Sequence, residues 1–103
     1  MPTQLTAQEF RRLIDRAAAA RDSLASCRTT LDEIEHESAA LARVTAELTA
    51  ATLRRPSAAL EQERAGMLQS IGRTAEFRLA QVRQIRAANQ REQQTVAARL
   101  QLI

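Results

Sequence analysis

The apolar residues in the first half of this chain recur at alternating spacings of three and four. This stripe begins at Phe10 and continues without interruption through Leu13, Ala17, Ala20, Leu24, Cys27, Leu31, Ile34, Ser38, Leu41, Thr45, Leu48 and Thr52. A sustained repeat of this kind is typical of the contact line of a coiled coil, which is narrower than the apolar face of a globular helix. Because nothing interrupts the repeat before the sequence LRRPS, the pattern predicts one helix over about residues 7–53.

The start of this helix carries a complete set of signals. Thr6 stands three residues before Glu9, the spacing of a capping box in which each side chain binds the other residue's backbone N–H. Leu5 and Phe10 occupy the two positions of a hydrophobic staple. The helix is therefore expected to begin at Ala7.

The one proline beyond residue 2 lies near the midpoint of the chain. Pro56 disfavours helical geometry at Arg55, and Ser57 is a good N-cap for a second helix. The second half carries a looser apolar stripe, which comprises Leu60, Met67, Leu68, Ile71, Ala75, Leu79, Val82, Ile85, Asn89, Gln93, Val96, Leu100 and Ile103. We therefore predict a turn at residues 54–57 and a second helix over about residues 58–102.

Two helices of nearly equal length, joined by a short turn, fold back on each other, so the predicted fold is all-α: a long, coiled-coil-like antiparallel two-helix hairpin. In the predicted register the numbers of paired residues sum to about 111. The acidic segment 32–37 then lies opposite residues 74–79, and the alanines 17–20 lie opposite Asn89 and Gln93. Polar residues that face alanines form either a layer that fixes the register or a shallow groove for the helix of a client.

Several apolar residues lie away from both stripes: Ile14, Val44, Phe77 and Leu102. At 100° per residue, Phe77 points roughly opposite to Val82. A two-helix hairpin is thin and buries little apolar surface. We therefore expect the hairpin to be completed to a bundle, either by self-association or by a partner.

The composition favours helices and removes several kinds of chemistry. Among the 103 residues, 21 are alanine and only two each are glycine and proline, which is typical of a single helical domain over residues 1–103. All 15 basic residues are arginine, which excludes mechanisms that need a lysine. His36 is expected on a solvated helix face, and Cys27 on the stripe behaves as a small apolar residue. The sequence thus predicts a protein that is not an enzyme, with no catalytic, metal or cofactor site.

A net charge of +3 and a sequence pI of about 10.9 make nucleic acid an alternative partner. However, the arginines of the second half are spread around the predicted helix, and the chain has no tyrosine or tryptophan on which bases could stack. No segment has the pattern of a secretory signal or of a membrane span. We therefore expect a soluble, cytoplasmic protein.

The last stretch of the chain, VRQIRAANQREQQTVAARLQLI over residues 82–103, resembles the C-terminal helix of the flagellar hook-junction export chaperones. The residues that carry the resemblance are Ile85, Asn89, Arg99 and Leu100. More broadly, the chain is similar to small helical proteins of the flagellum and of type III secretion, namely chaperones, needle or rod subunits and the stalk that contacts the export ATPase. The resemblance implies that the amphipathic helix of a client docks along the second helix, near Ile85, Asn89, Val96 and Leu100.

Together these observations favour a helical protein–protein interaction module, in the form of a chaperone or adaptor whose partner is another helical protein. The candidate partner-binding residues are Phe77, Ile85, Asn89, Gln93, Val96 and Leu100. Two alternatives remain open. One is a self-assembling coiled-coil subunit, either needle-, rod- or stalk-like or a homodimeric four-helix bundle, and the other is an arginine-rich protein that binds nucleic acid.

Overall fold

The computed structural model describes residues 3–102, which form mostly helix. In chain order the elements are β1 (Thr3–Leu5), α1 (Ala7–Ser26), α2 (Leu31–Ala50), β2 (Ala51–Leu53) and α3 (Ala58–Gln101). The helical fold class is therefore confirmed, with the addition of two short strands. The predicted residue Ile103 of the second stripe lies outside the described residues.

The prediction of one helix over residues 7–53 is wrong, because α1 ends at Ser26 and α2 begins at Leu31. Thr30 has extended backbone geometry and caps α2: its side-chain oxygen accepts a hydrogen bond of 3.4 Å from the backbone N–H of Glu33. Arg28 forms an ion pair of 3.0 Å with the same Glu33. Residues 27–30 thus form a loop between two helices, although the heptad spacing of the apolar residues continues across it.

The other predicted helix starts are confirmed. The N–H of Glu9 donates to the Thr6 hydroxyl oxygen at 3.2 Å, and the N–H of Thr6 donates to the Glu9 carboxylate at 3.1 Å, which completes the capping box. Ser57 caps α3 by accepting a hydrogen bond of 3.4 Å from the N–H of Leu60. The predicted turn corresponds to residues 54–57, which connect β2 to α3.

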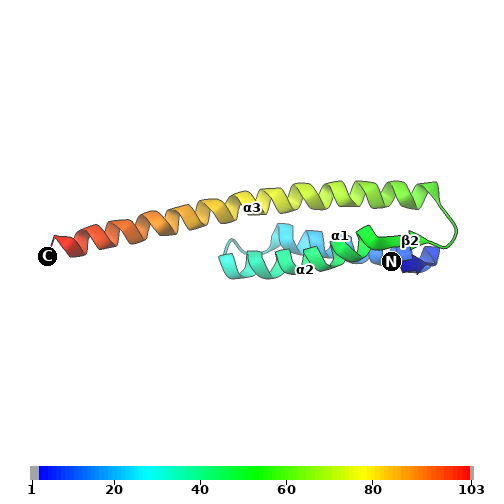
Figure 1. Ribbon diagram of the computed structural model, residues 1–103, viewed down its shortest axis with the longest axis horizontal. Coiled ribbons are helices and arrows are strands. Elements are labelled where there is room, and N and C mark those ends of the chain that lie inside the picture. Colours follow the sequence, from blue (N-terminus) through cyan, green and yellow to red (C-terminus); the bar gives the residue numbers. More distant parts are fainter. Residues whose placement is uncertain (1–2, 103) are drawn as a thin grey trace.

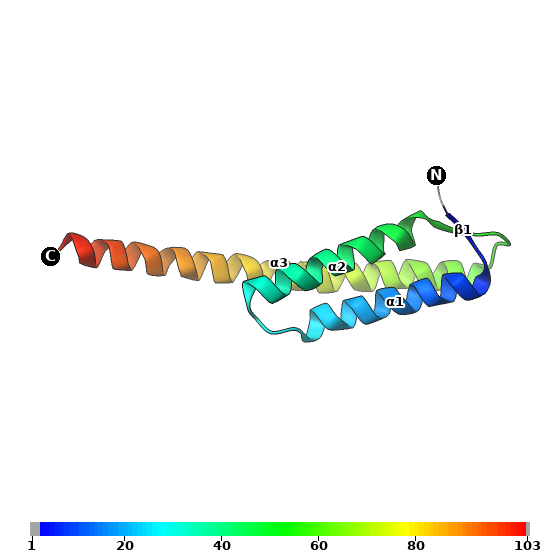
Figure 2. The ribbon, with the colours of Figure 1, turned by 90° about the horizontal axis from the view of Figure 1, so that it is seen from below.

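The helix directions also differ from the predicted hairpin. The loop 27–30 turns the chain back, so α2 runs antiparallel to α1 (Figure 2). Accordingly, Arg16 of α1 forms an ion pair of 3.0 Å with Glu47 of α2. The connection 54–57 turns it back again, so α3 is antiparallel to α2 and parallel to α1 (Figure 1). The pairs Arg11–Glu63 and Arg78–Leu24 fit this parallel course, since residue numbers rise together on both helices.

The predicted pairing of residues therefore has to be corrected. In the predicted register Glu35 would face Glu76, whereas its ion pair of 2.8 Å is with Arg86, further along α3. The alanines 17–20 do not face Asn89 and Gln93, because α1 ends beside Arg78 of α3 and these two polar residues lie beyond its end. The heptad pattern does not distinguish a parallel from an antiparallel neighbour, so it could not reveal this change.

A two-stranded parallel sheet closes one end of the molecule. Thr3 pairs with Ala51 and Leu5 pairs with Leu53. The N–H of Arg54 then donates to the carbonyl oxygen of Leu5 at 3.0 Å. Through this contact the residues before α1 are joined to the segment between α2 and α3, which explains why α2 ends at Ala50 although the heptad continues.

The core lies between the three helices and contains most of the first apolar stripe. Its buried apolar residues are Phe10, Leu13, Ile14, Ala17, Leu24, Ile34, Leu41, Val44, Leu48, Ala51, Ile71 and Val82. Ile14 and Val44 were predicted to lie off the contact line, and this prediction is wrong. A helix with two neighbours needs a wider apolar face than the narrow contact line of a two-helix coiled coil, and these residues supply that width.

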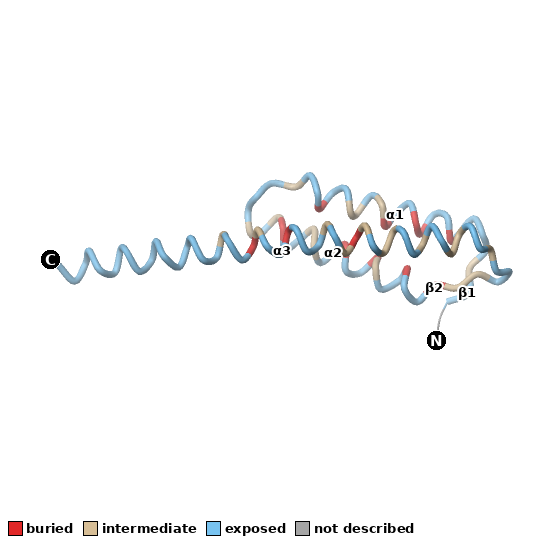
Figure 3. Tube along the Cα trace, turned by 90° about the horizontal axis from the view of Figure 1, so that it is seen from above, coloured by how far each residue is buried: buried red, intermediate tan, exposed pale blue. Residues whose placement is uncertain are grey.

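The third helix is much longer than the other two and projects past them. Val82 is the last buried residue of α3, Ile85 is half-buried, and all residues from Arg86 to Leu102 are exposed (Figure 3). We call residues 86–101 the extension, and the packed part, made of α1, α2 and the rest of α3, the body. The extension gives the molecule its long shape of 72 × 22 × 16 Å.

Candidate protein-binding surface

Four of the six candidate partner-binding residues lie together on the extension. Asn89, Gln93, Val96 and Leu100 line a shallow depression of about 450 Å³, together with Glu92 and Ala97. Val96 is 49% exposed and Leu100 is 65% exposed. The structure thus places two large apolar side chains and two amides on one side of an uncovered helix.

This side of the extension continues the face that α3 buries in the body. Asn89 and Val96 follow the buried Val82 at intervals of seven residues, which is close to two helical turns, so the three residues share one side of the helix. Within the body this side is covered by α1 and α2. In the extension the same side has no cover among the described residues.

The remaining two candidate residues lie elsewhere. Ile85 is half-buried and packs against the core at the point where the body ends. Phe77 is 64% exposed, and its position in the helical repeat puts it well away from the side shared by Val82 and Val96. The six residues therefore do not form one continuous surface, and Phe77 stands apart as a single exposed aromatic side chain.

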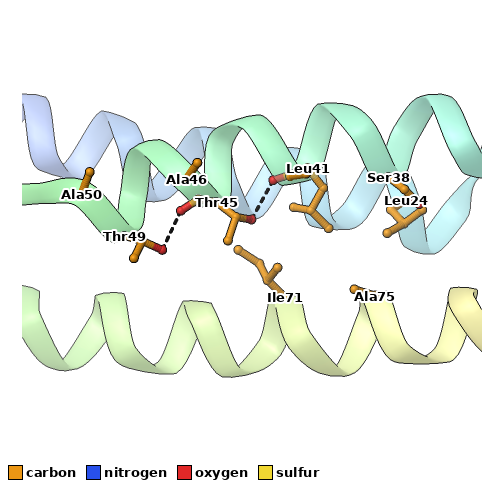
Figure 4. A pocket seen from close by; sticks show the side chains of 10 residues that line it. Leu24, Ser38, Leu41, Thr45, Ala46, Thr49, Ala50, Ile71 and Ala75 are labelled. Carbon is orange, nitrogen blue, oxygen red and sulfur yellow. Dashed lines mark hydrogen bonds between the residues drawn. The ribbon is translucent and has the colours of Figure 1, made fainter.

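A second surface, which sequence reasoning missed, is an apolar groove between α2 and α3 (Figure 4). Its volume is about 600 Å³, and its lining residues are Leu24, Ser38, Leu41, Ala42, Thr45, Ala46, Thr49, Ala50, Ile71 and Ala75. We call this feature the α2–α3 groove. Most of its lining comes from α2, and α3 contributes Ile71 and Ala75 on the opposite side.

The two threonines of the groove do not make it polar. The hydroxyl of Thr45 donates to the carbonyl oxygen of Leu41 at 2.6 Å, and the hydroxyl of Thr49 donates to that of Thr45 at 2.8 Å (Figure 4). Since both hydroxyl groups bond to their own helix, the polar atoms already have partners and the groove surface is mainly methyl groups and alanine side chains. The groove could have been recognised in the sequence from Ala42, Ala46 and Ala50, because small residues at intervals of four form one side of a helix.

The residues weighed for chemistry are dispersed. His36 is exposed on α2, and no cluster of three or more histidine, cysteine, aspartate or glutamate side chains suited to a metal ion occurs within residues 3–102. Cys27 is a half-buried free thiol at the end of α1, and its Sγ lies 3.2 Å from the carbonyl oxygen of Leu24.

Many arginines, among them Arg86 at the start of the extension, are engaged within the protein. Arg11, Arg16 and Arg86 form ion pairs with Glu63, Glu47 and Glu35 on other helices. Arg64 pairs with Glu61 and donates to the carbonyl oxygen of Ala51, while its guanidinium lies over the ring of Phe10, 5.9 Å from the centroid. These contacts show that much of the positive charge serves packing between the elements.

Among residues 3–102, no helix is both long and apolar enough to cross a membrane. Comparison with known proteins adds no relative, because no family model, no curated protein and no solved structure matches this chain.

Proposed function

We propose that this chain is a non-enzymatic protein–protein interaction module that binds an apolar helix of another protein along the extension of α3. The observation that carries the proposal is the exposure of Val96 and Leu100 on the same side of α3 that is buried in the body. A partner helix that covers this side would take the place that α1 and α2 hold further back along α3.

Physical arguments support this role for the extension. A helix of this length is only marginally stable by itself in water, because most of the stability of protein helices comes from packing of an apolar face. Contact with an amphipathic helix would supply that packing and remove Val96 and Leu100 from water. Asn89 and Gln93, on the same side, offer amide groups that can set the register of the bound helix.

A narrower form of the proposal is a cytoplasmic chaperone or adaptor of a flagellar or type III secretion system. It rests on the resemblance of residues 82–103 to the C-terminal helix of the hook-junction export chaperones. In this form the client's helix docks near Ile85, Asn89, Val96 and Leu100. The client then contacts the extension and leaves α1 and α2 uncovered.

The proposal is tested by capture of partners from the native cell with the tagged full chain. The double variant Val96→Asp/Leu100→Asp places two charges on the proposed surface, whereas Ala98→Asp adds a charge on the opposite side of the same exposed helix. One dominant protein should be recovered with the wild type and with Ala98→Asp, and lost with the double variant. Amides of residues 86–101 should exchange hydrogen more slowly when that protein is bound.

Two results would contradict this function. One is the absence of any specific partner. The other is equal recovery of the same partner with the wild type and with the double variant, since the extension would then not carry the contact.

A further inference from the structure

Two apolar surfaces stand uncovered among residues 3–102 and can be compared directly: the side of the extension that carries Val96 and Leu100, and the α2–α3 groove. We infer that the extension of a second copy of this chain lies in the α2–α3 groove, and that the contact is reciprocal, so that two chains form an antiparallel dimer. The inference goes beyond the proposed function, because it names the occupant of a groove to which that function assigns no role. The second copy and the client use the same side of the extension, so a bound client would displace the second copy from it.

The groove has the shape and chemistry of a place for one more helix. It is flanked by α2 and α3, and apart from Ser38 its lining residues are leucine, isoleucine, alanine and threonine. Both threonine hydroxyl groups bond to their own helix. Adding a helix along it would convert a three-helix arrangement into a four-helix one, in which facing apolar sides cover one another. The small residues Ala42, Ala46 and Ala50 allow the backbone of that helix to approach closely.

The lengths of the two surfaces agree. The α2 residues that line the groove run from Ser38 to Ala50, which is about 18 Å at 1.5 Å per residue. The extension runs from Arg86 to Gln101, which is about 22 Å on the same basis. A single extension is therefore long enough to cover the whole groove.

The chain cannot fill its own groove in this way. The helix α3 is continuous from Ala58 to Gln101, so its extension points away from the body and cannot fold back (Figure 1). The extension that lies along the body must therefore come from a second copy, and a closed dimer requires that the α3 of this copy runs in the opposite direction. A two-fold axis between the chains then makes the same contact twice and doubles the buried area, which is how small interfaces reach the size of a stable dimer.

Charge favours this occupant over a direct pairing of two extensions. The extension carries Arg86, Arg91 and Arg99 against Glu92, so two extensions side by side would repel each other. In contrast, α2 carries five acidic residues against one arginine: Asp32, Glu33, Glu35, Glu37 and Glu47 against Arg43. Four of these acids lie at the end of α2 nearest the extension, where the basic extension of the second copy would enter the groove. Glu33 and Glu35 already pair with Arg28 and Arg86 of their own chain, whereas Asp32 and Glu37 make no ion pair within residues 3–102.

The first test measures the mass of the pure full chain by light scattering over a range of concentrations. We expect about twice the chain mass of 11.4 kDa.

Val96→Asp/Leu100→Asp should weaken the dimer at least about tenfold, because it buries unpaired charge against methyl groups. Ala42→Arg should have the same effect from the groove side, through steric overlap and repulsion of the basic extension. Val96, Leu100 and Ala42 are all exposed, so these variants leave the core intact.

Matched controls separate the proposed contact from other modes of association. Ala98→Asp lies on the opposite side of the extension from the apolar stripe, and Ala80→Arg lies on the exposed side of α3 in the body. Both should dimerise like the wild type. Because the dimer is reciprocal, a mixture of the extension variant and the Ala42→Arg variant should recover a heterodimer that keeps one intact contact of the two.

A monomer at all concentrations would overturn the inference. So would a dimer that is weakened equally by the controls, or a mixture in which no heterodimer forms. None of these results touches the proposed function, since the client is absent from the experiment. Conversely, a chain that dimerises as described but captures no client would sustain this inference and contradict the proposed function.

Discussion

Arg78 of α3 closes the carboxyl end of α1, because its Nε donates a hydrogen bond of 2.9 Å to the carbonyl oxygen of Leu24. Its Nη2 donates to the carbonyl oxygens of Ala25 and Cys27 at 2.9 and 2.8 Å. The last turn of α1 contains no basic residue of its own. A helix end leaves carbonyl groups without partners in the helix, and a cation there also interacts favourably with the helix dipole. Arg78 therefore joins α3 to the break between α1 and α2.

Replacement of this side chain should destabilise the protein. Arg78 is only 5% exposed, and Arg78→Ala would remove the donors to the carbonyl oxygens of Leu24, Ala25 and Cys27. We expect the free energy of unfolding to fall by about 2 kcal/mol. Arg83→Ala, at an exposed position of the same helix, should change it by less than about 0.5 kcal/mol. Urea denaturation followed by circular dichroism measures both, and similar values for the two variants would contradict the capping role.

The reversal of the chain at residues 27–30 can be checked by a distance measurement. Spin labels would be attached at Arg16→Cys and Glu47→Cys in a Cys27→Ala background. In the structure these residues form an ion pair, and the axes of packed helices lie 8–10 Å apart, so the labels should be about 10–20 Å apart. One continuous helix over residues 7–53 would instead separate them by about 46 Å. A distribution centred near that larger distance would rule out the antiparallel arrangement of α1 and α2.

The two phenylalanines should respond in opposite ways to truncation. Phe10 is fully buried in the core, so Phe10→Ala should lower the free energy of unfolding by about 3–5 kcal/mol through lost burial and the cavity left behind. In a chain of this size that loss is expected to abolish the cooperative thermal transition. Phe77→Ala removes an exposed ring and should change the free energy of unfolding by less than about 0.5 kcal/mol. A large effect of Phe77→Ala on the isolated chain would mean that the ring is covered in solution.

The Arg11–Glu63 pair predicts a dependence of stability on pH. The hydrogen bond from Arg11 lowers the pKa of the Glu63 carboxyl below its ordinary value of 4.5, although desolvation opposes this effect. A carboxyl whose pKa is lower in the folded state stabilises the protein above its unfolded pKa, and that contribution is lost as the pH falls through the folded pKa. The wild type should therefore exceed Glu63→Gln in stability at pH 7, and the difference should vanish below the folded pKa.

Denaturation of the wild type and Glu63→Gln in parallel at pH 7, 5 and 3 measures this difference. Glu92→Gln, in the extension and far from Arg11, serves as the control for the loss of one carboxylate. High salt should reduce the Glu63 effect, since the pair is exposed to solvent. A difference between the wild type and Glu63→Gln that stayed constant over the whole pH range would show that the ion pair is not its cause.

Local sequence signals determined much of the secondary structure. The capping box of Thr6 and Glu9, the break at Pro56 and the cap at Ser57 all lie where the structure has helix boundaries, because these signals depend on hydrogen bonds within a few residues. The start of α2 was also encoded, since Thr30 and Glu33 repeat the spacing of Thr6 and Glu9. The uninterrupted heptad concealed it, because a side-chain pattern can continue in register across a loop.

Only the tertiary structure decided how the helices meet. The spacing of apolar residues by three and four indicates which side of a helix is covered. It does not indicate how many neighbouring helices cover that side or in which direction they run. Ile14 and Val44 became core residues because each helix of the body has two neighbours, and Arg78 became a cap because α3 passes the end of α1 in parallel. The α2–α3 groove depends on the same long-range packing. The extension was visible as a stripe in the sequence, but its exposure depends on where α1 and α2 end.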